Sequence, residues 1–225
     1  MADILIVLTS QAVFGDSDKP TGFWLEELAT PYYTLLEAGH RLTLCSPLGG
    51  LAPVDPASCD DQQMTSNCQR FLQDAEAMQR LATTLPLSDI DPGDHDAVFY
   101  PGGHGPLWDL REHAHSIHII ESMHAAGKPV AAVCHGPAVL LNAGAEDGRP
   151  LTAGRRVTAF SNSEEQAVGL ADQVPYLLED ALTHQGAVFC KAADWSDHCV
   201  VDGHLITGQN PASSGSVARA LLQLL

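Results

Sequence analysis

The chain has 225 residues, 45% of them hydrophobic, and no linker-like stretch divides it, so we predict a single domain over residues 1–225 with an insertion at about residues 47–95. Eleven Lys and Arg residues stand against 28 Asp and Glu residues, which gives a formal net charge of −17. A negative field of this size repels phosphate backbones and anionic lipid surfaces, so neither nucleic acid nor a membrane is an expected partner.

Short apolar runs rich in Val, Ile and Leu alternate with amphipathic stretches along the chain. This pattern is typical of an α/β fold in which helices cover both faces of a mostly parallel sheet. The first apolar run, residues 4–8, lacks the length and basic flank of a signal peptide or membrane span, so a cytoplasmic protein is expected. Strands are predicted at residues 3–9, 41–46, 96–101, 129–133, 156–160 and 187–191. Helices are predicted at about residues 22–38, 114–126, 137–143, 173–185 and 211–224.

The first predicted helix carries two adjacent glutamates. Its apolar face is formed by Leu25, Leu28, Tyr32 and Leu35. On a helical wheel Glu26 falls on the polar side, whereas Glu27 lies at the border of the apolar face, where burial lets a carboxyl keep its proton. A protonated Glu27 can donate a hydrogen bond to a nearby sulfur. The alternative is a pair of solvated surface glutamates.

Residues 47–95 are rich in Pro, Asp and Gln and are broken by one helix-like segment from about Cys68 to Leu85. Cys59 and Cys68 lie in this polar stretch, where a disulfide has no support from the spacing. The six cysteines of the chain form no CxxC pair, so reduced thiols are expected.

A glycine cluster, residues 101–106 with the sequence PGGHGP, follows the strand at residues 96–101. In α/β folds ligands bind at this carboxyl edge of the sheet, and glycines let backbone N–H groups approach a substrate oxygen there. We therefore predict a substrate-binding group of Gly103, His104 and His135, with the Gly103 and His135 amides as oxyanion donors. Glycines alone also suit a plain turn, and the spacing of a phosphate-binding loop is absent.

Several histidines occur in or near the helix at residues 114–126. His115, His118 and Glu121 recur every three residues, a spacing that also suits metal ligands on one helical face. Because no outlying ligand completes a tetrahedral set, a solvated helix face is expected and no metal is predicted.

Residues 130–137, with the sequence VAAVCHGP, indicate a buried strand, a tight turn and a helix with Pro137 at its first position. This is the context of a nucleophile elbow, which lifts the side chain at the turn clear of the sheet edge. Cys134 is the predicted nucleophile, with a thiol pKa lowered by the following helix N-terminus, and His135 is its neighbouring base. The alternative is a core cysteine followed by a histidine by chance.

An acid that orients His135 is expected from another loop at the same sheet edge. Glu164 and Glu165 follow the strand at residues 156–160, and the residues alone do not choose between them. Alternatively, Ser163 caps a helix and both glutamates occupy its first turn, where the helix dipole favours negative charge.

Residues 197–208 indicate an antiparallel edge hairpin. Two apolar runs, residues 199–201 and 205–207, flank Asp202 and Gly203. This pair favours the positive backbone angles of a type I′ turn.

Taken in order, these motifs resemble the ThiJ/PfpI superfamily of class I glutamine amidotransferase-like proteins, within it the branch of glyoxalase III-like heat-shock chaperones. The likeness runs along the whole chain. It rests on Leu8-Thr9-Ser10, on Thr21-Gly22 followed by Glu27, on Gly103-His104-Gly105, on residues 131–137 and on residues 207–213. The resemblance implies a flavodoxin-like, doubly wound fold, usually a homodimer, and conversion of methylglyoxal to lactate without glutathione. Protein deglycase and chaperone activities are also known in relatives.

Carried over position by position, the resemblance implies four catalytic residues: Cys134, His135, Glu165 and Glu27. Glu165 is preferred to Glu164 because the family shares its spacing from Phe160 and Gly169. The implied substrate is a small 2-oxoaldehyde, to whose aldehyde carbon the Cys134 thiolate adds, and no metal or organic cofactor is implied.

Two other functions stay open. The same elbow and oxyanion donors suit a cysteine amidase or peptidase. A reactive thiol at the elbow also suits a redox-sensing stress chaperone in which turnover is incidental.

Overall fold

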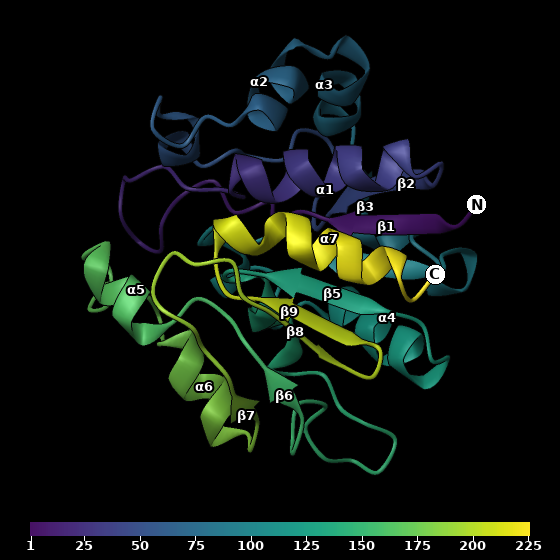
Figure 1. Cartoon of the computed structure of the whole chain (residues 1–225), viewed down its shortest axis with the longest axis vertical. Helices are drawn as coiled ribbons and strands as arrows, with labels where there is room; N and C mark the ends of the chain where they lie inside the picture. Colours follow the sequence, from purple (N-terminus) through teal and green to yellow (C-terminus); the bar gives the residue numbers. More distant parts are fainter.

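The computed structural model describes residues 1–225, and its centre is a seven-stranded sheet with the order β3-β2-β1-β4-β5-β9-β8 (Figure 1). Neighbouring strands are parallel except β8 and β9. The strands are β1 (Asp3–Val7), β2 (Arg41–Ser46), β3 (Leu85–Pro86), β4 (Ala97–Tyr100), β5 (Val130–Val133), β8 (Cys199–Asp202) and β9 (Leu205–Gly208). The predicted α/β fold with a mostly parallel sheet is confirmed.

The sheet is covered on both faces, which explains why its strands are continuously apolar. Alternate residues of β1 enter different clusters: Ile4 and Ile6 pack with helices α1 (Leu25–Glu37) and α7 (Ser214–Leu222), whereas Leu5 and Val7 pack on the side of α4 (Ala114–Ala125). In Figure 1, α1 and α7 lie in front of the sheet and α4 lies behind it. No helix combines the length and apolar composition needed to cross a membrane.

The segment predicted as an insertion adds β3 to the edge of the sheet and two helices that lie over α1 (Figure 1). The one predicted helix is in fact two, α2 (Ser66–Gln73) and α3 (Ala75–Ala82). Asp74 separates them because its backbone is extended and its carboxylate accepts the first N–H groups of α3. Phe71 packs its ring edge-on to Tyr32 of α1, with the centroids 5.3 Å apart.

Three predicted elements differ from the structure. Residues 137–143 hold a short 3₁₀ helix over Gly136–Leu140 rather than an α-helix. The strands predicted at residues 156–160 and 187–191 shrink to β6 (Arg156–Val157) and β7 (Val188–Phe189), which pair with each other outside the main sheet. The backbone N–H groups beyond β6 have other acceptors, since Thr158 donates to Thr207 Oγ1 and Phe160 donates to the Cys134 carbonyl.

The one helix predicted between β6 and β7 is also shorter than expected. The predicted helix at residues 173–185 begins later, as α6 (Leu178–His184), and a further helix, α5 (Asn162–Ala167), precedes it. In Figure 1 these two helices lie with β6 and β7 beside one end of the sheet. This peripheral segment carries both candidate acids.

The antiparallel edge hairpin is confirmed, with β9 pairing with β5 and β8 forming the edge. Asp202 pairs with Leu205, so the two turn residues are Gly203 and His204, one position later than predicted. Only Gly203 has a positive φ, 62°, which is the pattern of a type II′ turn rather than type I′. Asp202 stays in the strand, where its carboxylate accepts the Arg156 N–H.

Candidate active site

Cys134 occupies the sharp turn between β5 and the following 3₁₀ helix. Its φ of 59° lies in the left-handed region, which is unusual for a residue with a side chain. Two backbone hydrogen bonds hold it there, from Cys134 N–H to the Gly208 carbonyl and from Phe160 N–H to the Cys134 carbonyl. Residue 136, two positions after Cys134, must be glycine, because a Cβ there would lie 2.4 Å from the Tyr100 carbonyl oxygen. This is the geometry of a nucleophile elbow.

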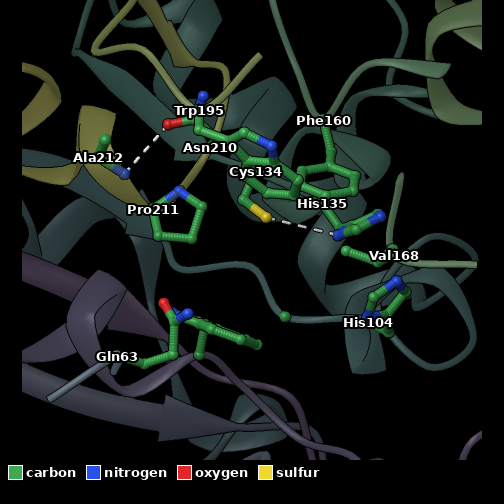
Figure 2. Close-up of a pocket in the computed structure, with 12 residues that line it drawn as sticks. Gln63, His104, Cys134, His135, Phe160, Val168, Trp195, Asn210, Pro211 and Ala212 are labelled. Atoms are coloured by element: carbon green, nitrogen blue, oxygen red, sulfur yellow. Dashed lines mark hydrogen bonds between the residues drawn. The ribbon is translucent and has the colours of Figure 1, made fainter. Parts of the chain in front are cut away.

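The elbow opens into a cavity of about 460 Å³ at the carboxyl edge of the sheet (Figure 2). The structure brings four of the predicted site residues to its wall: Gly103, His104, Cys134 and His135. The sequence reasoning missed the rest of the lining, which comes from several distant loops: Trp24, Gln63, Phe160, Val168, Trp195, Asn210, Pro211 and Ala212. Residues 210–212 lie in a motif that carried the family resemblance, and Phe160 served there as a spacing marker, whereas nothing in the sequence marks Gln63 or Val168.

His135 links the sulfur to Glu165. Its Nδ1 lies 3.5 Å from Cys134 Sγ, and its Nε2 lies 2.6 Å from Glu165 Oε2. A carboxylate can only accept, so Nε2 carries the proton and Nδ1 presents a lone pair to the thiol. The imidazole is thereby oriented as a base toward Cys134.

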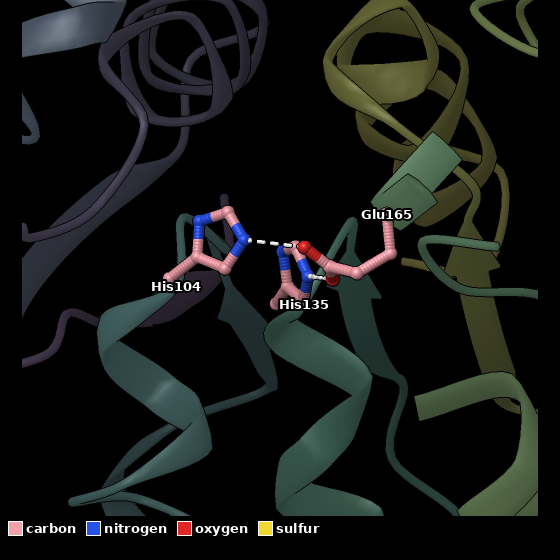
Figure 3. Close-up of side chains that lie close together, drawn as sticks. All are labelled: His104, His135 and Glu165. Atoms are coloured by element: carbon pink, nitrogen blue, oxygen red, sulfur yellow. Dashed lines mark hydrogen bonds and ion pairs between the residues drawn. The ribbon is translucent and has the colours of Figure 1, made fainter. Parts of the chain in front are cut away.

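His104 is a second partner of the same carboxylate (Figure 3). Its Nε2 lies 2.9 Å from Glu165 Oε1, and its ring centroid is 4.1 Å from that of His135. Sequence reasoning placed His104 with the substrate and missed this bond, although its position at the end of the adjacent strand was a signal for it. The three side chains are close enough to hold a metal ion, but their facing atoms already bond to one another.

Burial and mutual contact fix the charges of this group. Burial, and then the neighbouring His104, lower the pKa of His135 to about 4, against the opposite effect of Glu165. Burial alone would raise the pKa of Glu165, yet the two imidazoles hold it well below its usual range. At neutral pH the group therefore consists of a neutral His135 and an ionised Glu165.

Glu27 is fully buried, so for this residue the surface-pair alternative is wrong. Its Oε2 accepts the Gly102 N–H over 2.6 Å, whereas its Oε1 is buried without a hydrogen-bond partner. Burial raises the pKa of Glu27 to about 8, an effect that its interactions with Cys134 and Gly102 oppose. Glu26, one position earlier, instead accepts a bond from Thr30.

The pKa of the Cys134 thiol is raised, not lowered as the sequence suggested. Burial is the main cause, the charge of Glu27 is the second, and the N–H groups of Gly103 and His135 oppose both. The expected helix N-terminus is only a short 3₁₀ turn, and the expectation left out the cost of burying a thiolate. When Glu27 holds a proton its charge no longer opposes the thiolate, so the two groups act as a coupled pair.

The two adjacent glutamates take different places. Glu165 binds the two imidazoles, whereas Glu164 forms a capping box with Ser161 at the start of α5. The cap is thus Ser161, not Ser163 as one alternative proposed. Glu164 Oε1 also accepts the Trp195 N–H and the Asn210 side-chain amide.

The histidines around α4 do not converge on a site. Glu121 accepts the Gly144 N–H, His118 contacts Ser122, and His124 contacts Arg155. The His115, His118 and Glu121 spacing thus forms no ligand cluster in the structure.

A cysteine at a strained strand-to-helix turn, with a carboxylate-bound histidine beside it, defines the class of α/β proteins with a nucleophile elbow. Residues 20–224 match the DJ-1/PfpI family model, and the chain belongs to the DJ-1/PfpI family. The sequence is 28% identical to Glyoxalase 3 of Candida albicans, over 99% of this chain and 98% of the relative. It is 29% identical to the glutathione-independent glyoxalase HSP31 of Saccharomyces cerevisiae, over 96% and 94% of the two chains.

Two solved structures are also similar to this chain along its whole length. The crystal structure of the Francisella tularensis Rapid Encystment Protein 24 KDa has a TM-score of 0.95 and 35% identity, covering 100% of this chain and 99% of that one. Glyoxalase III of Candida albicans has a TM-score of 0.91 and 26% identity, covering 100% and 97% of the two chains.

Proposed function

We propose that this protein is a glutathione-independent glyoxalase that converts methylglyoxal to lactate, with Cys134 as nucleophile. The observation that carries the proposal is the alignment of Cys134 Sγ, the His135 ring and Glu165 at the strained elbow. The full-length similarity to relatives named as glyoxalases supports the same activity. The reaction class is that of a hydro-lyase acting in the hydration direction.

In the first step the sulfur adds to the aldehyde carbon. His135 Nδ1 takes the thiol proton as the C–S bond forms, and the carbonyl electron pair moves to oxygen. The N–H groups of Gly103 and His135, which face the sulfur, lie beside the developing oxyanion and stabilise it. Return of the proton to that oxygen gives a hemithioacetal.

In the second step a proton leaves the first carbon, which was the aldehyde carbon, and another is added to the second carbon, which was the ketone carbon, through an enediol. The first carbon is oxidised and the second reduced, so no external oxidant or reductant is needed. The product is a lactoyl thioester on Cys134, which water cleaves to lactate and free thiol. The base is His135, which Glu165 orients, or alternatively Glu27.

Glu27 supplies a proton close to the sulfur. With a pKa of about 8 it is mostly protonated at neutral pH, and its carboxyl lies against Cys134. Its Oε1, which has no hydrogen-bond partner in the resting structure, is the oxygen free to donate to the sulfur as the thiol proton leaves for His135. Gly102 fixes the other carboxyl oxygen, so the donor does not rotate away.

The test is lactate formation from methylglyoxal without glutathione by wild type, Cys134→Ala and Cys59→Ala. Cys59 is an exposed free cysteine outside the cavity, so its variant is the matched control and should keep wild-type turnover. Cys134→Ala should lose essentially all turnover. A Cys134→Ala enzyme that still forms lactate at the wild-type rate would remove the proposal.

The same preparations separate the other candidates. A cysteine amidase or peptidase would cleave amide or peptide substrates faster than it converts methylglyoxal. A redox-sensing chaperone would suppress aggregation in a way that depends on Cys134 while turning over neither substrate. The homodimer stays a prediction, which sedimentation of the wild type tests.

A further inference from the structure

The cavity at Cys134 is larger than methylglyoxal requires. Its volume of about 460 Å³ falls in the range of about 300–1,000 Å³ for sites that hold drug-sized ligands. Methylglyoxal has only three carbons. A three-carbon aldehyde bound at Cys134 would fill only part of a cavity of this volume.

The lining of this extra space has a clear chemical character. None of the twelve lining residues carries a charged Asp, Glu, Lys or Arg side chain. A phosphate or carboxylate on the substrate would find no cation there. Six of the twelve are hydrophobic, among them Phe160 and Trp195, and the polar ones away from Cys134 and His135, Gln63 and Asn210, are uncharged amides, so part of the wall suits a flat apolar substituent.

Two aromatic rings of the cavity wall follow one another from His135 outward. The Phe160 ring lies 4.5 Å from the His135 ring between centroids, and the Trp195 ring lies 5.7 Å from Phe160, edge to face. Figure 2 shows Phe160 beside His135 and the Trp195 side chain at the same cavity. Trp195 is 48% exposed, so this large aromatic residue stays partly open to the cavity and solvent.

The backbone of Trp195 is strained in the same way as that of the nucleophile. Cys134 and Trp195 are the only residues other than glycine with a positive φ, 59° and 64°, and both line the cavity. A bulky aromatic residue rarely adopts this conformation, and such strain persists only where the surroundings impose it. Glycine would hold the same turn without strain, so the turn itself does not require an indole.

A buried carboxylate imposes the conformation. Glu164 Oε1 accepts the Trp195 N–H over 2.9 Å, the Asn210 side-chain amide over 2.8 Å and the Gln209 amide over 3.1 Å. Its Oε2 accepts the Ser161 N–H. The proposed reaction uses no proton or charge of Glu164. Its bonds tie the Trp195 loop to the Asn210 turn, which is the adjacent part of the cavity wall.

We infer that Trp195 determines substrate specificity by packing its indole against an aryl group on the ketone carbon of a 2-oxoaldehyde, and that Glu164 is the positioning residue for this wall. The inference rests on the proposed function. The preferred substrates are aryl 2-oxoaldehydes, with methylglyoxal as a smaller and poorer member of the same class.

The experiment compares kcat/KM for phenylglyoxal and methylglyoxal in wild type, Trp195→Phe and Trp195→Gly. Wild type should favour phenylglyoxal. Trp195→Gly suits the positive φ, so the loop should keep its fold, and the ratio of the two kcat/KM values should fall roughly tenfold. Trp195→Phe should keep most of the ratio. Leu48→Gly, at an exposed apolar residue outside the cavity, is the control and should keep the wild-type ratio.

The positioning role is tested by a double-mutant cycle. Glu164→Gln places an amide among donor groups and should lower the phenylglyoxal to methylglyoxal ratio in the wild-type background but not in Trp195→Gly. A merely structural Glu164 would lower both kcat/KM values alike in both backgrounds, which would overturn its assignment.

The glyoxalase function and the preference for aryl substrates are separated by different outcomes. If wild type converts neither aldehyde, the proposed function fails. If wild type converts both but prefers methylglyoxal, or if Trp195→Gly leaves the ratio unchanged, only the specificity inference is overturned.

Discussion

The two sides of the cavity are held in place by different kinds of contact. On the reacting side, Glu165 bonds to two imidazoles and so fixes charges and proton positions. On the side formed by Trp195 and Asn210, Glu164 accepts bonds from backbone and amide groups that do not titrate. Neighbouring residues of one short helix thus support two parts of the cavity wall. The reactive wall contains His104, Cys134 and His135, and the shaping wall contains Trp195 and Asn210. Changes on the first should alter turnover, and changes on the second should alter stability and substrate choice.

The largest expected effect comes from replacing the Glu165 carboxylate by an amide, and the adjacent Glu164 provides the matched comparison. Glu165→Gln should lower kcat for methylglyoxal by about 10²–10⁴-fold, because an amide neither fixes the His135 tautomer nor stabilises its cation. Glu164→Gln should lower kcat far less while lowering the melting temperature, since it leaves the buried donors of Ser161, Trp195 and Asn210 facing an amide. Steady-state kinetics and thermal unfolding measure both. Equal kcat values for the two variants would erase the distinction between the walls.

Glu27 gives the reacting side a pH signature. Its folded pKa of about 8 exceeds the ordinary 4.5, so its proton stabilises the fold at low pH, and this contribution is lost as pH rises from about 4.5 to about 8. Glu27→Gln has no such proton, and its stability should not show this loss. Between these pH values the wild type should lose, relative to Glu27→Gln, up to about 1.4 kcal/mol of unfolding free energy per pH unit. Urea unfolding at both ends of the range tests it, and parallel curves would contradict the buried, protonated carboxyl.

His104 should matter less than Glu165, because it bonds to Glu165 Oε1 and not to His135. His104→Phe keeps a ring but removes the donor, and we expect about a tenfold loss in kcat. The pH profile of kcat should also move, because the pKa of His135 is lowered partly by His104. An unchanged kcat and pH profile would show that His135 is oriented without it.

The smallest effect is expected at the cap of α5. Ser161→Ala removes the hydroxyl of the capping box and should lower the unfolding free energy by about 1 kcal/mol. The loss should fall on stability rather than on kcat for methylglyoxal, because the Ser161 backbone N–H still reaches Glu164. A large fall in kcat would instead show that the capping box also holds Glu165 in its position beside His135.

The parts of the fold predicted best are those decided by local pattern. The strand at residues 41–46 matches β2, and the elbow at Cys134 was found because apolar strand, small turn residues and Pro137 occur together. The burial of Glu27 followed from its place on the helical wheel. Each of these signals is contained within a few consecutive residues.

What could not be predicted depends on contacts between distant segments. The strand at residues 156–160 is cut short because Thr158 and Phe160 give their N–H groups to Thr207 and Cys134. The shift of the Cys134 thiol pKa depends on burial and on Glu27, more than a hundred positions away. The strained Trp195 has no sequence signature, because its conformation is imposed by a carboxylate from another helix.

The hydrogen bond from Phe160 N–H to the Cys134 carbonyl joins the elbow to the peripheral segment of β6, β7, α5 and α6. That segment contributes no strand to the main sheet and is held to it by side chains such as Val157 and Leu182 in the core. Segments outside the main hydrogen-bonded sheet open before the rest of a fold. Its opening would withdraw Phe160 and Glu165 together and free the Cys134 turn to relax. On gentle warming, activity should therefore be lost before the main sheet unfolds. It should return on cooling.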